Sequence, residues 1–568
     1  MSAQHVAILG HLGPLARAAA AALELRGHAV ARIESPAVPA QQDALRPETI
    51  LIFPFAPSMR REAIEDSAAD LRYLRTCLEW SRQAGATRAV LRSHAIAYGC
   101  SMKNPGLLEE GRPSLLPRDS VSRRWLEAEG ILFEFPDLAP AALRLTTLLD
   151  PAEGDLIARM LAGRLALPLA GYDPQLQLLS LSDAAEALAR AVQSRATGIF
   201  NIAPAGTVPV KDAMKASVPW RLPIAGALQK PIRSLLWKRN LAAFPGELYD
   251  CLKYNWTISP ARASEELGFE PKASSSEALR DFLGRSGRGR PERIRSSYDE
   301  FGLDPDYLEK FSWWFSFLRK VYWRVEVEGL ENIPKTDAAL LVANHRGFMP
   351  FDGVVHRSLI LKAHNRHIRF LVIPSLFKFP FLSDFLIRQG GVVASQANTR
   401  KLFARRELVG IFPEGINGAF RMYRGAYKLG EMGRNVFARM AIENGVPIIP
   451  AAVIGHVEIF PILKRIPSSL VTRMTGWPFF PITATFPLLP LPLPTKWHIR
   501  YLEPIPVNHL RPSDAGNPKV VGELAAHVGQ LLQKNIDEML SRRKHVFFGN
   551  IFDRSAVPSN HPPLKASR

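Results

Sequence analysis

Two short segments in the second half of the chain contain residue types that suit transfer of an acyl group to a hydroxyl. Residues 344–352 read Asn-His-Arg-Gly-Phe-Met-Pro-Phe-Asp, so His345 precedes Asp352 at a predicted strand-to-helix turn. A neutral imidazole in such a pair can accept the hydroxyl proton as the oxygen attacks a thioester, while the carboxylate fixes the tautomer of the ring. Alone, this string favours a structural loop histidine.

The second segment makes the chemical interpretation stronger. Residues 411–415 read Ile-Phe-Pro-Glu-Gly and place Glu414 on a turn that follows an apolar strand. Arg421, Arg424 and Lys428 come soon after it, spaced to line one side of a site. Guanidinium groups bind phosphates bidentately and a lysine adds a point charge, so these residues suit an anionic group of a substrate. The alternative is a solvated basic face.

The elements that must position these residues follow an α/β pattern. Residues 339–343 are a short apolar strand, and the helix after it is expected to run to about residue 360. Pro350 is well tolerated at a first helical turn, and Asp352 would lie in that same turn, near the positive end of the helix. A histidine on the preceding loop is then within reach of that carboxylate. Residues 408–411 and 446–455 are further buried strands.

This half of the chain resembles the glycerolipid acyltransferase superfamily, which includes lysophosphatidate acyltransferases, and is most similar to its mono- and diacylglycerol-acyltransferase-like branch. The resemblance covers about residues 310–510 and rests on ordered blocks at 322–334, 390–403, 412–415, 446–455 and 491–507. It implies that His345 and Asp352 form a catalytic dyad. It also implies that Glu414 and Gly415 help to build the acceptor site, and that Pro450 shapes the pocket.

Two departures from the family pattern bear on the acceptor. More residues separate His345 from Asp352 than in the best-known pattern, so the dyad must span a loop and a helix start. The block that usually carries a phosphate-gripping arginine reads Val-Val-Ala-Ser at 392–395. A neutral acylglycerol, or a headgroup bound by Arg421 and Arg424, is therefore expected in place of a glycerol phosphate.

The first half of the chain has a glycine pattern of its own. Gly10, Gly13 and Ala16 lie directly after an apolar strand and open an Ala- and Leu-rich helix. Small residues at such a turn let the backbone approach a pyrophosphate, which the helix N-terminus favours electrostatically. Glu34 ends the second strand, where an acid could accept the ribose hydroxyls. The alternative is that the glycines are purely structural.

Residues 5–283 resemble the extended short-chain dehydrogenase/epimerase family, through the segments 84–99, 178–192, 198–204 and 262–272. The resemblance implies a Rossmann-like, doubly wound parallel sheet that binds NAD or NADP, or that has lost the nucleotide. The family's catalytic residues do not carry over. His94 stands at the serine position, and Asp119 and Arg123 stand where tyrosine and lysine belong. Redox or epimerase chemistry is therefore not expected.

The net charge and the cysteines indicate which kinds of partner and which cellular compartment to expect. The 568 residues carry a net charge of +19, which implies an anionic partner such as lipid headgroups or CoA-like substrates. Zinc-finger, RNP and basic-zipper patterns are missing, so nucleic acid is not expected, and the chemistry needs no metal. Cys77, Cys100 and Cys251 show neither a disulfide framework nor metal-binding spacing, which favours a reducing compartment. The N-terminal sequence is not that of a signal peptide.

Four regions are expected: an epimerase-like domain over 1–283, a basic linker over 284–300, an acyltransferase domain over 301–545 and a loose tail over 546–568. Residues 310–325 combine aromatic rings with cations, which suits the membrane–water boundary, and residues 477–494 are apolar but rich in proline. Neither qualifies clearly as a transmembrane helix, and ordinary core packing is the alternative. We expect a cytoplasmic protein that lies peripherally on the membrane.

These patterns predict a membrane-associated O-acyltransferase that moves an acyl group from acyl-CoA or acyl-carrier protein to a hydroxyl of a glycerolipid or lysophospholipid. His345 is the expected general base and Asp352 its orienter. Two other functions compete with this one: an NAD(P)-dependent epimerase or oxidoreductase, and a non-catalytic lipid-binding scaffold.

Overall fold

The structure, a computed structural model, describes residues 4–552 apart from 35–45, 56–66, 112–119, 154, 226–230, 233–234, 236–245, 288–291, 293, 295–297, 347–348, 431, 433–434, 476 and 486–491. It divides into two compact units, of which the first comprises residues 1–306 and 376–393 and the second residues 307–375 and 394–568. Part of the predicted linker and most of the predicted tail lie outside the described residues. The domain boundaries expected from the sequence stay a prediction.

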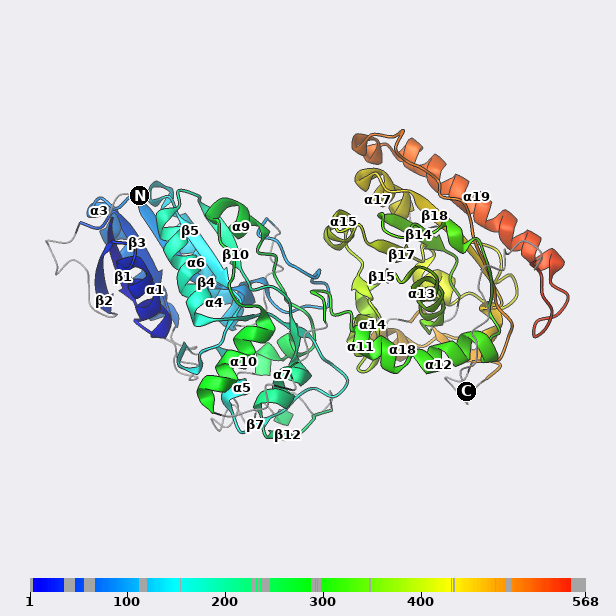
Figure 1. The fold of residues 1–568 in the computed structure, drawn as a ribbon, viewed down its shortest axis with the longest axis horizontal. Helices are drawn as coiled ribbons and strands as arrows, with labels where there is room; N and C mark the ends of the chain where they lie inside the picture. Colours follow the sequence, from blue (N-terminus) through cyan, green and yellow to red (C-terminus); the bar gives the residue numbers. More distant parts are fainter. Residues whose placement is uncertain are drawn as a thin grey trace, which may run out of the picture. The chain divides into compact units, whose positions relative to one another are not determined.

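The first unit is built on a six-stranded parallel sheet with the order β10-β5-β4-β3-β1-β2 (Figure 1). Its strands are β1 His5–Gly10, β2 Ala29–Glu34, β3 Thr49–Phe53, β4 Arg88–His94, β5 Ala141–Leu145 and β10 Gly198–Ile202. The order reverses between β1 and β3, which makes the carboxyl ends of these two strands the topological switch point. This confirms the predicted Rossmann-like, doubly wound sheet.

Helices cover both faces of this sheet because alternate side chains of each strand point to opposite faces. Val6 and Ile8 of β1 pack in one core with helices α1 Pro14–Glu24 and α6 Leu181–Gln193. Ala7 and Leu9 of the same strand pack in a second core with α3 Ser67–Gln83 and α4 Ser120–Phe133.

Smaller elements complete the first unit. Its remaining helices are α5 Leu156–Ala162, α7 Val210–Ser217, α9 Ala261–Leu267, α10 Ser275–Ser286 and α14 Leu382–Arg388. Short strand pairs join β6 Thr147–Leu148 to β9 Leu178–Leu179, β7 Leu165–Ala166 to β12 Trp220–Arg221, and β8 Gln175–Leu176 to β11 Val208–Pro209. Single helical turns are η2 Ala95–Tyr98, η3 Pro136–Leu138, η4 Pro151–Glu153 and η5 Gly246–Leu252.

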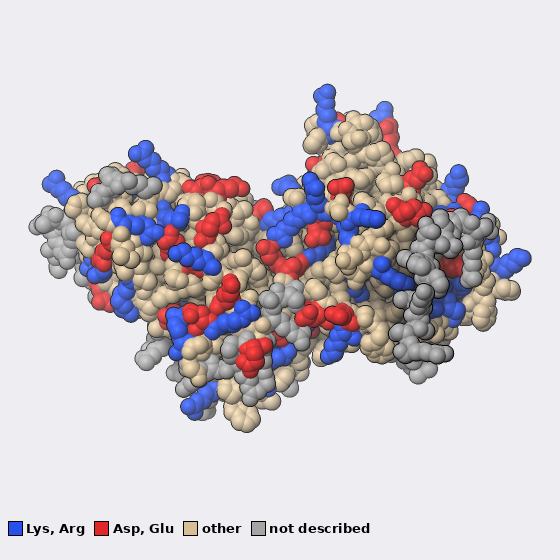
Figure 2. Space-filling model, viewed as in Figure 1, with Lys and Arg blue, Asp and Glu red and all other residues tan. Residues whose placement is uncertain are grey.

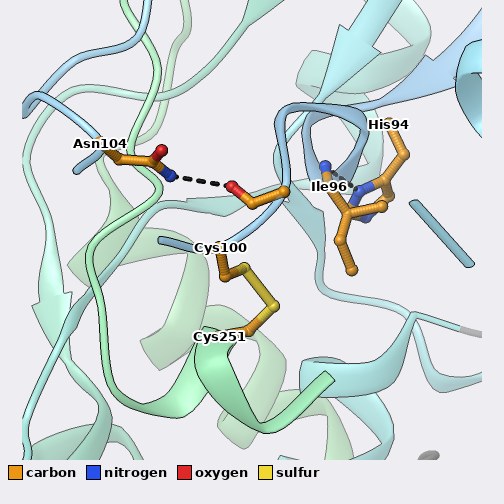
Figure 3. Close-up of a disulfide and its surroundings, with 6 residues drawn as sticks. His94, Ile96, Cys100, Asn104 and Cys251 are labelled. Atoms are coloured by element: carbon orange, nitrogen blue, oxygen red, sulfur yellow. Dashed lines mark hydrogen bonds between the residues drawn. A yellow bond between two sulfur atoms is a disulfide. The ribbon is translucent and has the colours of Figure 1, made fainter. Parts of the chain in front are cut away.

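One expectation about the cysteines is wrong. Cys100 and Cys251 form a disulfide, with their Cα atoms 5.0 Å apart (Figure 3). Cys77 is buried as a free thiol. The two cysteines are separated by 151 residues in the sequence. Such a pairing depends on how η2 and η5 pack, and spacing along the chain carries no signal of it.

The second sheet has seven strands in the order β13-β21-β18-β14-β17-β15-β16. They are β13 Glu326–Glu328, β14 Ala339–Ala343, β15 Ile368–Val372, β16 Val392–Val393, β17 Leu408–Ile411, β18 Ile448–Ile454 and β21 His498–Tyr501. The central strand β14 runs parallel to β17 and β18, and all of its residues are buried. Strand β21 is antiparallel to β18.

The main helices of the second unit are α13 Phe351–His364, α15 Gln396–Ala404, α17 Val436–Asn444 and the long α19 Pro518–Arg542, drawn in orange and red in Figure 1. Shorter elements are α11 Pro305–Lys310, α12 Ser312–Phe317, η7 Leu318–Tyr322, η8 Leu330–Asn332, η9 Pro374–Lys378, α16 Gly415–Ala419, η11 Val457–Ile459, β19 Ile462–Ile466, α18 Ser469–Thr475, β20 Phe480–Thr483 and η12 Pro512–Gly516. Among the described residues, every helix is too short or too polar to cross a membrane.

On the face that Figure 2 draws, the basic residues are spread out and not gathered in one patch. Figure 2 shows Lys and Arg interspersed with Asp and Glu over the described residues of the face that it draws. On that face the net charge of +19 forms no continuous basic stripe of the kind that tracks a nucleic-acid backbone.

Candidate active site

The predicted histidine and aspartate lie within hydrogen-bonding distance. His345 follows the end of the buried strand β14, and Asp352 is the second residue of α13. The Nδ1 atom of His345 is 2.7 Å from Oδ2 of Asp352, and the backbone N–H of Arg346 donates to the same oxygen at 3.2 Å. An acid in a first helical turn is stabilised by the helix dipole. The strand, the turn and the helix therefore bring the two side chains together.

The protonation states of the pair follow from this geometry. Asp352 is 1% exposed, and burial alone would raise the pKa of its carboxyl. Neighbouring His456 and the hydrogen bond from His345 outweigh burial and hold the pKa of Asp352 below its usual value. Burial lowers the pKa of His456 itself to about 3, so His456 is neutral near pH 7 and the bond from His345 carries the effect there. The ionised carboxylate makes His345 donate through Nδ1, which leaves Nε2 as an acceptor.

Neighbouring side chains hold the histidine loop in place. The Asn344 amide donates to the Val453 carbonyl at 2.9 Å, and the Val453 N–H donates back to the Asn344 side-chain oxygen at 2.8 Å. This exchange fastens the end of β14 to β18. The ring of Phe412 stacks on that of His345 with 4.7 Å between their centroids. The imidazole is therefore held from two sides while it stays partly exposed.

Glu414 lies at the same site but bonds to a residue that the sequence analysis missed. Its Oε1 accepts from Nη1 of Arg346 at 2.7 Å, and its Oε2 accepts from the backbone N–H of Gly430 at 2.8 Å. Both charged side chains of this pair are at least 97% buried. The signal that could have found it is the position of Arg346 directly beside the histidine. The predicted contact of Glu414 with the acceptor stays a prediction.

The guanidinium of Arg346 ties the histidine loop to a second loop. It donates to the carbonyls of His345 and Ala426, both at 2.6 Å, and to that of Lys428 at 3.1 Å. The Arg421 guanidinium donates to the same Lys428 carbonyl. Loop 426–430 is thereby fixed beside the dyad.

The other predicted substrate residues surround this cluster. Gly415 adopts a positive φ of +52° at the start of α16, a conformation that suits glycine. Arg424 is exposed, and among the described residues its side chain forms no hydrogen bond or ion pair. Binding of a headgroup by Arg421 and Arg424 stays a prediction.

The predicted nucleotide residues of the first unit have mainly structural roles. Gly10 has φ +105°, and a Cβ there would lie 2.1 Å from the carbonyl oxygen of Phe53, so strand packing alone requires glycine. Gly13 is the N-cap of α1, and Ala16 is buried in the core beneath that helix. Glu34 is exposed at the end of β2.

A carboxylate already occupies the position that a pyrophosphate would take. Oε1 of Glu153 accepts from the backbone N–H of Leu15 at 2.5 Å, at the N-terminus of α1. The same oxygen would lie 2.7 Å from a Cβ on Gly13. A helix N-terminus attracts one anion, and a second anion in the same place would be repelled. The residues around Gly10 and Gly13 therefore do not fit a dinucleotide in the usual position.

The residues at the family's catalytic positions are engaged in other ways. His94 is buried, and its Nε2 lies 2.9 Å from Oδ2 of Asp155. Arg123 is exposed, and Asp119 lies outside the described residues. Over the same described part of the chain, no group of three or more His, Cys, Asp or Glu side chains is arranged to hold a metal ion.

Comparison with known proteins identifies an acyltransferase domain in this chain. A family model described as Acyltransferase matches residues 324–454. An uncharacterized protein of Mycobacterium leprae is 36% identical over 270 residues, which cover 45% of this chain and 72% of that protein. An uncharacterized protein of Mycobacterium tuberculosis is 36% identical over 267 residues, with 45% and 74% covered. The chloroplastic phytyl ester synthase 2 of Arabidopsis thaliana is 31% identical over 144 residues, 23% of this chain and 20% of that protein.

Solved structures of epimerase type align with half of the chain. MoeE5 in complex with UDP-glucose and NAD has a TM-score of 0.39 at 18% identity, and covers 50% of this chain and 99% of its own. The UDP-glucose 4-epimerase of Thermus thermophilus, in complex with NAD, has a TM-score of 0.38 at 18% identity, with the same coverage. The Rossmann-like assignment rests on the strand order of the first unit and not on these scores.

The family model places acyltransferase sequence on the strands and helices that hold His345, Asp352 and Glu414. The mycobacterial relatives are matched over more than two thirds of their own length. Residues 324–454 therefore form a domain of the acyltransferase family, and the chain belongs to one family with these mycobacterial proteins.

Proposed function

We propose that the second unit transfers an acyl group from an acyl thioester, carried by CoA or acyl-carrier protein, to a hydroxyl of a lipid. The observation that carries this proposal is the 2.7 Å contact between His345 and Asp352 in a domain of the acyltransferase family. The contact occupies Nδ1 of the imidazole and leaves Nε2 for the substrate. A base oriented in this way is what hydroxyl activation requires.

The reaction follows from the two protonation states. Nε2 of His345 takes the proton of the acceptor hydroxyl while its oxygen attacks the thioester carbonyl. The imidazolium that forms is stabilised by Asp352, whose carboxylate is already ionised. When the tetrahedral intermediate collapses, the carbon–sulfur bond breaks and the thiolate takes the proton from the imidazolium. The products are an ester and a free thiol, and the dyad returns to its starting state.

The acceptor that the sequence favours has no phosphate beside the reacting hydroxyl. The segment 392–395, which includes β16, has no arginine to grip one. The similar Arabidopsis protein carries the name of a phytyl ester synthase, a name that denotes esterification of a long-chain alcohol. Both observations support a neutral acylglycerol or a long-chain alcohol over lysophosphatidate.

Exposed aromatic and aliphatic side chains of the second unit support binding to a membrane surface. Trp313 and Trp314 of α12 are 66% and 41% exposed, and Val321 of η7 is exposed beside the basic residue Lys320. A second exposed set, Leu463, Ile466 and Leu470, lies on β19 and α18. Aromatic rings beside cations favour the headgroup boundary. We propose peripheral binding through these elements.

The decisive experiment is an acceptor panel with radiolabelled acyl-CoA and the full chain. The panel holds a monoacylglycerol, a long-chain alcohol and lysophosphatidate. We expect ester formation with the first two, a loss of at least 100-fold in His345→Ala and Asp352→Asn, and no loss in His527→Ala, an exposed histidine on α19. Ester formation that survives His345→Ala would overturn the mechanism. Vesicle binding without ester formation would favour the lipid-binding scaffold.

A further inference from the structure

The first unit contains a pocket that acyl transfer does not use. It opens at the carboxyl ends of β1, β3 and β4, where open α/β sheets usually bind ligands. Arg92 on β4 and Arg124 on α4 both line it, and these residues are 8% and 3% exposed. The Nε atom of each guanidinium is buried with no partner, and neither side chain forms an ion pair or hydrogen bond with a described residue.

Aromatic rings cover the faces of both guanidinium groups. The Cζ atom of Arg92 lies 4.7 Å from the ring centroid of Trp125, and that of Arg124 lies 4.7 Å from the ring centroid of Phe55. Stacking satisfies the faces but leaves the N–H groups in the guanidinium plane without acceptors. Burial and the neighbouring charge of Arg92 lower the pKa of Arg124 to about 10. Both guanidinium groups lie over the ring of Trp125, with Cζ of Arg124 5.8 Å from its centroid, so a bound anion would stabilise two cations at once.

The carboxylates of the same pocket are committed to helix ends. Asp155 caps α5 by accepting from the backbone N–H groups of Ile157 and Ala158, and it also bonds to His94. Glu153 accepts from Leu15 at the start of α1. Both carboxylates compensate helix dipoles, and neither reaches an arginine of the pocket within ion-pair distance. Glu153 and Asp155 favour the charge of Arg92 only from a distance, so Nε of both arginines still lacks a hydrogen-bond acceptor.

We propose that Arg92 and Arg124 bind a small oxyanion, a carboxylate or a phosphate group, at a cavity of about 30 Å³ that has no room for an aromatic ring. Guanidinium forks match the geometry of both oxyanions. The ligand is not a dinucleotide, because Glu153 occupies the helix N-terminus that would hold the pyrophosphate. The site is separate from the candidate active site and does not depend on the proposed acyl transfer.

Calorimetric titration of the full chain tests the proposal, with acetate and inorganic phosphate as probes for the two oxyanions and NAD as the competing class. We expect binding of at least one oxyanion probe, with affinity reduced at least 10-fold in Arg92→Met and in Arg124→Met. The control is Arg72→Met, which removes an exposed arginine from α3 and should bind as the wild type does. Binding of acetate alone would identify a carboxylate ligand, and binding of inorganic phosphate alone would identify a phosphate.

Stability without ligand gives a second readout. Because each guanidinium is buried without an ion pair, we expect the unliganded methionine variants to unfold at or above the wild-type temperature. If a methionine variant does not fold, Arg92→Lys and Arg124→Lys retain the charge but lose the fork, and should still weaken binding. The proposal is overturned if neither oxyanion binds, if the arginine variants bind as the wild type does, or if NAD binds more tightly than both probes.

Discussion

Two neighbouring residues of one loop, His345 and Arg346, pair with two different carboxylates. His345 is oriented by Asp352, which lies on the following helix, whereas Arg346 turns to Glu414 on the loop after β17. The first pair is partly exposed and leaves a nitrogen for substrate. The second is fully buried and every oxygen of its carboxylate has a protein donor. We infer that the dyad performs the chemistry and that the buried pair fixes the distance between the loops around it.

Loss of the Glu414 charge should act first on stability. In Glu414→Gln the guanidinium of Arg346 stays buried without its counter-ion, which costs about 3–5 kcal/mol when a buried pair is broken. We expect the urea midpoint of the second unit to fall accordingly, and Arg346→Met combined with Glu414→Leu to recover part of the loss. Glu443→Gln, at a partly exposed position near the end of α17, serves as the control. Unchanged stability with lost activity would instead indicate direct contact of Glu414 with the acceptor.

Buried histidines should make the second unit sensitive to acid. Burial lowers the pKa of His356 to about 4 and that of His456 to about 3, against about 6.5 for an unfolded chain. The unfolded chain therefore takes up protons first, so the stability is present above pH 6.5 and is lost as the pH falls toward these lower values. Between pH 6 and 4 each histidine should cost about 1.4 kcal/mol per pH unit.

Urea unfolding at a series of pH values measures this dependence. His356→Gln, which removes one titrating group but keeps a polar partner for the Tyr501 hydroxyl, should flatten the slope by about one histidine. His527→Gln on the exposed face of α19 should leave the slope unchanged. A wild-type slope near zero in this range would show that these histidines are already protonated in the folded chain.

At the scale of elements, the strands that lead to the site could be predicted and the contacts between them could not. Residues 339–343 and 408–411 predict β14 and β17 with the bounds found, because fully buried parallel strands read as continuous apolar runs. The bond from Leu15 to Glu153 joins residues 138 positions apart, and that from Arg346 to Glu414 joins residues 68 apart. Such pairs meet only once the order of the strands is set, and no local pattern encodes that order.

The exposed tryptophans of helix α12 are predicted to contribute to membrane binding. Trp313→Ser combined with Trp314→Ser removes two exposed indoles, and should weaken binding of the full chain to anionic phospholipid vesicles about 10-fold or more. Sedimentation with vesicles measures this. Trp220→Ser, which removes a 73% exposed indole from β12 of the first unit, is the matched control and should bind as the wild type does. Equal binding of both variants would assign the exposed tryptophans of α12 to another role.

At the scale of the whole molecule, each unit is built from two separate stretches of the chain. The first unit takes in residues 376–393, which lie in the sequence between β15 and β17 of the second sheet. Within the first unit, Arg388 forms ion pairs with Asp173 at 2.6 Å and with Asp304 at 2.7 Å, and Lys211 pairs with Asp384 at 3.2 Å. The segment is thus held by residues from distant parts of the chain.

This arrangement predicts that Arg388 secures the segment in the full chain. Asp173 and Asp304 are buried, so Arg388→Met would break two buried ion pairs at once, and breaking a buried pair costs about 3–5 kcal/mol. Limited proteolysis should then cut faster within 376–393, and the first unit should unfold at lower urea. Lys211→Met removes a half-exposed pair and should change either quantity little, since partly exposed ion pairs contribute less than about 1 kcal/mol. If Arg388→Met is cut no faster than wild type, the apolar contacts of the segment are sufficient to hold it.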